Sequence, residues 1–185
     1  MRISEVPWKR VKGSRGEHPH CFLKGSEERQ TCEVVVERGK AGARAIGGLD
    51  GLVMLKSTDS AFTGYPKTRF TTLPETRDRI FCTSVTAEWA YGSSKARFGT
   101  CRDEIRRALI DTFAAHKSES VQQTLYAMGA AALYACMSID SIRLSMPNKH
   151  CLLVNLRSFG MENANEVFVP TDEPHGLIEA TIVRR

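Results

Sequence analysis

The order of periodic segments from residue 49 onward is the strongest constraint on the fold of this chain. Two strand-like segments come first, two segments with helical spacing follow, and further strand-like segments come last. This ββααββ order favours an α+β domain, in which an antiparallel β-sheet carries two helices on one face. Nothing in the chain repeats at the period of a solenoid.

The strand-like segments alternate between apolar and polar residues. In residues 79–89, Phe81, Val85 and Trp89 share one side. A later strand starts near Ile142, is expected to break at Pro147 and resumes up to residue 156. Other strands are expected at residues 49–56 and in a final strand pair, 167–169 with 177–183.

The two helices follow from apolar residues at helical spacing. Ile105, Leu109 and Phe113 define the buried face of the first helix. In the second helix, Val121, Leu125, Met128, Ala132 and Cys136 share one face. Ser120 and Gln123 form a capping box that marks where this second helix begins.

Residues 5–38 are predicted to form a β-hairpin around a Gly/Ser turn at residues 13–16. A Gly/Ala-rich passage at residues 39–48 then reads as a joint. We therefore divide the chain into residues 1–40, the hairpin, and residues 41–185, the ββααββ unit. A hairpin alone is marginally stable, so it is expected to dock on another part of the molecule.

Composition excludes several classes of protein. The chain has 185 residues, 42% of them hydrophobic, and a net charge of +5, as expected for a globular protein rather than a disordered one. Its six cysteines include no C-x-x-C pair, which argues against a zinc ribbon and for buried free thiols. No signal peptide, membrane span or C-terminal Ser-Lys-Leu address is visible, so a cytoplasmic location is expected.

Three features could carry chemistry. The helix start at Val121 and Gln122 offers backbone N–H groups and an amide to an anion or a heterocycle, although an ordinary capped helix would look the same. Asn148 and His150 share a strand face and could form a proton relay, or His150 could be structural. Arg79 could clamp a planar anion, or pair with a surface carboxylate such as its neighbour in sequence.

Metal and nucleic-acid sites are not favoured. His18 and His20 point the same way on a strand, but no third ligand lies near them in the sequence. The basic clusters at residues 9–12 and 184–185 lack interleaved aromatic residues, which makes them a solvated face rather than a nucleic-acid footprint.

Several segments resemble the urate oxidase (uricase) family, in the same order along the chain. They are GLVMLKSTDSAFTGYP at residues 51–66, FTTLPETRDRI at 70–80, SVQQTLYAMG at 120–129, SMPNKH at 145–150 and NEVFVPTDEPHGLIEATI at 165–182. The hairpin, with VPWKR and HPHCFLKGSEERQT, looks like the middle of that family's chain. The resemblance thus runs from about residue 6 to residue 185.

This resemblance implies two tandem T-folds (tunnelling folds), each ββααββ, in a homotetramer that binds urate between subunits. It implies oxidation of urate by O₂ to 5-hydroxyisourate and hydrogen peroxide, with no metal and no organic cofactor. The matching substrate-binding residues are Phe62, which stacks on the purine, Arg79, which clamps it, and Val121, Gln122 and Asn148. Asn148 also lies at the oxygen or water site, and His150 matches the relay histidine.

Two further catalytic elements of the family, a lysine and a threonine–aspartate pair, match no motif in this sequence. The chain therefore resembles the C-terminal portion of a urate oxidase, with a remnant hairpin of the first T-fold and a complete second one. We expect it to be inactive alone, and to act as a homo-oligomer or with a complementing N-terminal half. The alternative is a non-catalytic T-fold that binds purine-like heterocycles or serves in oligomerisation.

Overall fold

The computed structural model describes residues 8–13, 16–24, 28–39, 42–72, 74–93 and 95–184. Its elements, in chain order, are β1 (Trp8–Gly13), β2 (Gly16–Lys24), β3 (Arg29–Val35), β4 (Arg44–Lys56), β5 (Phe81–Tyr91), α1 (Phe98–Ala115), α2 (Val121–Ala135), β6 (Ile139–Asn148), β7 (Cys151–Leu153), the short 3₁₀ helix η1 (Arg157–Phe159), β8 (Phe168–Pro170) and β9 (Gly176–Val183).

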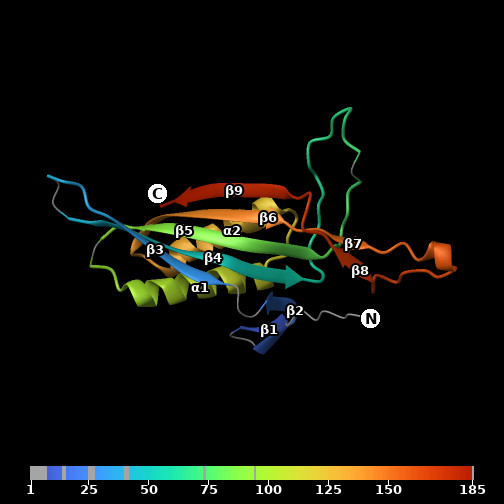
Figure 1. The fold of residues 1–185 in the computed structure, drawn as a ribbon, viewed down its shortest axis with the longest axis horizontal. Helices are drawn as coiled ribbons and strands as arrows, with labels where there is room; N and C mark the ends of the chain where they lie inside the picture. Colours follow the sequence, from blue (N-terminus) through green and yellow to red (C-terminus); the bar gives the residue numbers. More distant parts are fainter. Residues whose placement is uncertain are drawn as a thin grey trace.

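The main sheet is antiparallel and runs β1-β2-β4-β5-β6-β9, with β3 also paired to β4. Both helices lie on the same face of this sheet, while β7 and β8 form a separate arm at one end (Figure 1). The predicted α+β architecture with two helices on one face is therefore confirmed. Among the described residues, no helix is long and apolar enough to cross a membrane.

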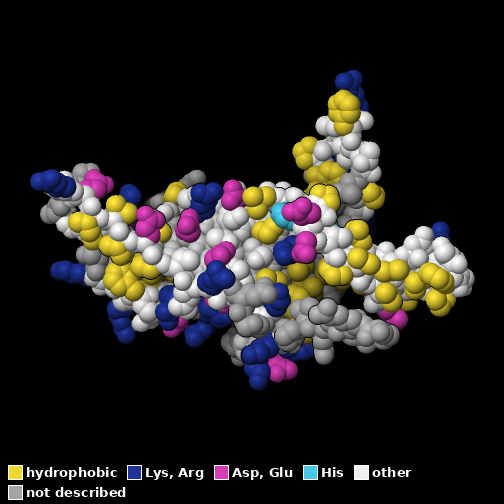
Figure 2. Space-filling model, in the orientation of Figure 1, with side chains coloured by type: hydrophobic (Ala, Val, Ile, Leu, Met, Phe, Trp, Pro, Cys, Tyr) yellow, Lys and Arg dark blue, Asp and Glu magenta, His cyan; other side chains and the backbone are white. Residues whose placement is uncertain are grey.

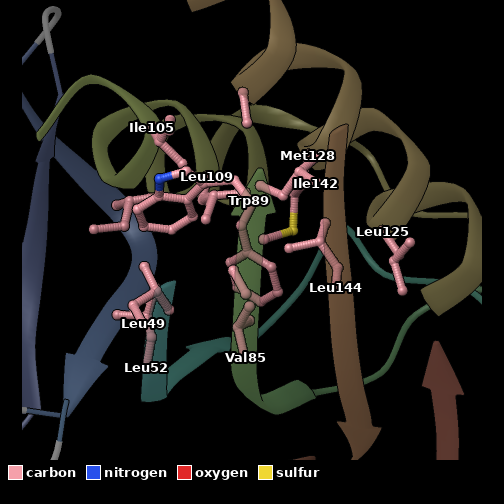
Figure 3. Close-up of a cluster of buried hydrophobic side chains, with 14 of the residues drawn as sticks. Leu49, Leu52, Val85, Trp89, Ile105, Leu109, Leu125, Met128, Ile142 and Leu144 are labelled. Atoms are coloured by element: carbon pink, nitrogen blue, oxygen red, sulfur yellow. The ribbon is translucent and has the colours of Figure 1, made fainter. Parts of the chain in front are cut away.

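The core lies between the sheet and the helices, as the periodicities predicted. Trp89 of β5 is surrounded by side chains from α1, α2, β4 and β6 (Figure 3). Ile105 and Leu109 of α1 are fully buried against this face, as is Met128 of α2. Since burying one large apolar side chain contributes about 1.5–3 kcal/mol, this layer supplies most of the driving force for folding.

The N-terminal hairpin is confirmed in its first half. β1 and β2 pair across the predicted turn, with Gly13 opposite Gly16. Ser14 and Arg15 of that turn, and Val6 and Pro7 of the first run, lie outside the described residues. The second run of the hairpin was predicted to form a single strand, and this prediction was wrong. The run forms two strands, β2 and β3, and each of them pairs with β4. The hairpin thus docks on β4, while the division at residues 40 and 41 stays a prediction.

The prediction of a joint at residues 39–48 was also wrong in its second half, because β4 already begins at Arg44. A Cβ atom at Gly47 would lie 2.5 Å from Nε1 of Trp89, and one at Gly48 would lie 2.7 Å from the carbonyl oxygen of Ala87. These glycines are therefore required by close packing within the sheet and do not mark a connection.

Two further predictions about strands were wrong. Strand β6 continues through Pro147, which lies opposite Leu177 of β9. The ladder between β6 and β5 ends earlier, at Ser145, so a residue without an N–H group is tolerated there. The expected final strand pair does not form either, because β8 pairs with β7 while β9 pairs with β6.

We predict that Gly47→Ala destabilises the protein by about 1–3 kcal/mol, because the added methyl group would overlap a rigid indole. Gly99→Ala is the matched control, since a Cβ atom there meets nothing within 4 Å. In α1 it should change stability by less than about 1 kcal/mol, in the stabilising direction. Urea unfolding measures both, and equal midpoints for the two variants would contradict the packing argument.

We predict that thiol reagents distinguish the cysteines at pH 8. Burial raises the pKa of Cys21 and Cys82 to about 11, so about one in a thousand of these thiols is ionised at pH 8. Cys32 is exposed and should be labelled first. Peptide mass spectrometry measures the order, and Cys32→Ser should remove the fast phase. Rapid labelling of Cys21 in the folded protein would contradict this prediction.

Candidate functional site

The start of α2 is shaped by the predicted capping box. The Ser120 side chain accepts a hydrogen bond from the Gln123 amide at 3.2 Å, and Gln123 Oε1 accepts one from the Glu119 amide at 2.8 Å. The hydrogen bond back from the Gln123 side chain therefore reaches Glu119, the residue before the N-cap, rather than the N-cap itself. Val121 is buried and Gln122 is exposed. The N–H groups of these two residues are at helix positions that have no intrahelical acceptor.

A loop after β4 pairs with the start of α2. The Ser118 amide donates to the carbonyl of Asp59 at 3.0 Å, and the Ala61 amide donates to the carbonyl of Ser118 at 2.7 Å. Phe62 follows directly and exchanges two backbone hydrogen bonds with Thr76, of 2.8 and 3.2 Å. Phe62 is therefore held next to the helix start although the two are far apart in sequence.

The Phe62 ring is half-buried and stacks on Tyr65, with ring centroids 4.4 Å apart and planes inclined by 16°. The Arg79 guanidinium lies 5.9 Å from the Phe62 ring centroid. An aromatic surface and a cation thus lie side by side, which suits a flat, anionic heterocycle.

Arg79 connects this loop to the sheet. Its amide donates to the carbonyl of Ser60 at 2.8 Å, and its Nη1 donates to Oδ1 of Asn148 at 3.0 Å. Asp78, the alternative partner considered from the sequence, instead accepts from the Thr58 hydroxyl at 2.9 Å. Arg79 is therefore directed into the structure, toward the end of β6.

Two nitrogen atoms of Arg79, Nε and Nη2, are buried and have no hydrogen-bond partner among the described residues. Burial also lowers the pKa of Arg79. An unpaired buried guanidinium is costly, whereas its fork is matched to two adjacent acceptors of a planar anion. Here the geometry favours bidentate binding of a ligand edge.

His150 lies two residues beyond Asn148, after β6 has ended. The Lys149 amide donates to the carbonyl of Cys82 at 2.9 Å, and the Thr171 amide donates to the carbonyl of His150 at 2.9 Å. These bonds fix the backbone of this segment on both sides. The role of the His150 side chain stays a prediction.

Hydrogen bonds connect the segments that carry Phe62, Arg79 and Asn148, and the bond between Ala61 and Ser118 brings this loop beside the start of α2, where Val121 and Gln122 lie. Sequence reasoning missed the polar residues that support them. Ser118 and Thr124, both fully buried, share a hydroxyl hydrogen bond of 2.8 Å beneath the helix start.

Lys56 was also missed. It is completely buried, and its Nζ donates to the carbonyl of His116 and lies 5.6 Å from the Phe113 ring centroid. The alternation of β4 could have revealed it, because Leu52, Met54 and Lys56 fall on one face of the strand. No group of three or more potential metal ligands was found among the described residues, those around His18 and His20 included.

Comparison with known proteins places this geometry in a family. The uricase family model matches residues 45–179, which is most of the chain. The chain belongs to the uricase family. Uricase from Arthrobacter globiformis is 42% identical over 177 residues, which cover 96% of this chain and 57% of the relative. Uricase from Arabidopsis thaliana is 40% identical over 204 residues, which cover 100% of this chain and 64% of the relative.

Solved structures agree. The crystal structure of the Arthrobacter globiformis uricase matches with a TM-score of 0.82 at 40% identity, covering 97% of this chain and 60% of that one. A urate oxidase from Bacillus sp. TB-90 matches with a TM-score of 0.74 at 20% identity, which shows the shared fold. The T-fold prediction is thereby confirmed. This chain spans about 57–64% of the length of the uricases it matches.

We predict that Ser120→Ala destabilises this uricase-family chain by about 1 kcal/mol, because the Gln123 amide loses its capping oxygen. Ser120→Thr retains a hydroxyl and is the matched control. Thermal unfolding measures the difference. Equal melting temperatures for Ser120→Ala and the unaltered chain would show that the cap contributes nothing.

Proposed function

We propose that this chain is a urate oxidase that binds urate at the junction of the loop at 59–62, the start of α2 and the end of β6. The observation that supports this best is the buried fork of Arg79, with two unpaired nitrogen atoms beside Phe62 and Asn148. A urate anion is planar and carries adjacent carbonyl and ring-nitrogen acceptors, which match both an aromatic surface and a guanidinium fork.

In this proposal Phe62 stacks on the purine plane while Arg79 binds one edge of the ring system. The exposed side chain of Gln122 and the backbone of Val121 bind a second edge, because the amide can both donate and accept. Three directions of contact would fix the ring in one orientation, which a reaction at a single ring carbon requires.

The chemistry needs only urate, O₂ and water. Urate gives up two electrons, O₂ takes them up with two protons and becomes hydrogen peroxide, and water supplies the hydroxyl group of 5-hydroxyisourate. The ionised purine is itself the reductant, so we propose that no metal or organic cofactor takes part. Asn148 would hold O₂, peroxide or water over the ring, and His150 would move protons.

Part of the catalytic machinery of the family has no counterpart in this chain. The family's lysine and threonine–aspartate pair have no match in this sequence, so we propose that turnover requires them from a complementing chain segment. The exposed apolar residues of the β7–β8 arm support assembly with another chain (Figure 2); they are Leu152, Leu153, Phe159, Met161, Val167 and Val169. We propose a homotetramer, as the resemblance implies.

Binding and turnover are tested separately. We expect the chain alone to bind a non-oxidisable urate analogue in a calorimetric titration, and to release no hydrogen peroxide when mixed with urate in air. Absence of binding would overturn the proposed function. Peroxide release by the chain alone would show that the unmatched lysine and threonine are not required.

Arg79→Lys retains the charge but loses the fork, so the analogue should bind at least about tenfold more weakly, since one charged hydrogen bond is worth about 1.5–3 kcal/mol. Arg69→Lys is the matched control, because Arg69 lies on the same loop and is exposed. Its affinity should equal that of the unaltered chain. If both variants bind equally well, Arg79 does not clamp the ligand.

A further inference from the structure

The segment His18-Pro19-His20-Cys21, which no proposed catalytic step uses, lies on β2 beside the loop that carries Phe62. Nε2 of His20 is 3.1 Å from Oδ2 of Asp59. The amide of Ser57 donates to the carbonyl of His20 at 3.2 Å. The N-terminal hairpin therefore holds this loop through one backbone hydrogen bond and one pair of side chains.

Asp59 has an unusual backbone. Its φ angle is +59°, in the left-handed region that few residues other than glycine adopt. Its side chain contacts His20 of the hairpin, and its carbonyl accepts the amide of Ser118 before α2. One residue thus connects the hairpin to the start of the helix.

Two histidines, a lysine and a thiol lie around this pair. The His18 ring packs edge-on against His20, with centroids 4.6 Å apart. Burial lowers the pKa of both His18 and Lys56, and the charge of Asp59 acts on both in the opposite direction. Cys21 lies opposite Lys56 in the β2–β4 register, and Nε2 of His116 is buried without a partner among the described residues. The Asp59 carboxylate therefore favours the charged forms of Lys56 and His18 against the effect of burial.

We propose that His20 and Asp59 form a positioning pair for the urate site. Their contact holds the left-handed turn, and the three residues after it meet the site: the carbonyl of Ser60 accepts the amide of Arg79, Ala61 pairs with Ser118, and Phe62 follows. Without the contact the turn relaxes, and the stacking ring moves relative to the guanidinium. This inference rests on the proposed function and adds a role for two residues that touch no substrate.

The test uses the full chain and calorimetric titration with the non-oxidisable urate analogue. His20→Gln replaces the imidazole and Asp59→Asn replaces the carboxylate, so each variant removes one partner of the 3.1 Å contact. Asparagine tolerates the left-handed backbone, so the turn itself is not strained. Each single variant should raise the Kd about tenfold, and the double variant should be no weaker than either one, because contacting residues are not additive. Glu17→Gln is the matched control, since it removes an exposed ion pair with Lys12 in the same hairpin and should leave the Kd unchanged.

The binding stoichiometry in the same titration distinguishes a positioning role of this pair from a role in the stability of the fold alone. A purely structural role would lower the fraction of chains that bind and leave the Kd of the remainder unchanged, and that result would overturn the inference. The exchanged variant, His20→Asp with Asp59→His, should restore the Kd of the unaltered chain. It also tests the contact if a single variant does not fold. An exchanged variant that folds but binds as weakly as Asp59→Asn would overturn the inference. Absence of analogue binding by the unaltered chain would overturn the proposed function and this inference together.

Discussion

The pairing of residues 59–61 with Ser118 is the interaction on which the candidate site depends. Two backbone hydrogen bonds join a loop that follows β4 to Ser118, three positions before the first residue of α2. Ser118 is fully buried, and its hydroxyl is bonded to Thr124 in the first turn of the helix. Because the loop also receives the amide of Arg79, a shift at this point would move the stacking ring, the clamp and the helix start at once.

Charge is unusually well buried around this junction. Lys56 is completely buried and Arg79 is half-buried, and burial lowers the pKa of both. Burying a charge costs free energy that an apolar side chain of similar size would avoid. Arg79 presents unpaired nitrogen atoms for a ligand. Lys56 is bound to the carbonyl of His116, just before the residues that begin α2.

The local sequence pattern predicted where the strands and helices lie better than it predicted which segments they contact. The period-2 alternation of β5 and the helical spacing of α1 identified Trp89, Ile105 and Leu109 as core residues, because burial on one face selects apolar residues at that period. The pattern failed at Gly47, whose role is to admit the indole of Trp89, and at Pro147, which lies within β6. Both depend on neighbours that are remote in sequence.

The sequence by itself determined the ββααββ order, the capped start of α2 and, through resemblance, the family and the residues proposed to bind urate. Short-range periodicity and motif identity are sufficient for these conclusions. Only the tertiary structure decided that β2 and β3 share β4, that Arg79 contacts Asn148 rather than Asp78, and that His20 meets Asp59. These contacts join residues between 9 and 69 positions apart in the chain, and they arise from packing that no local pattern records.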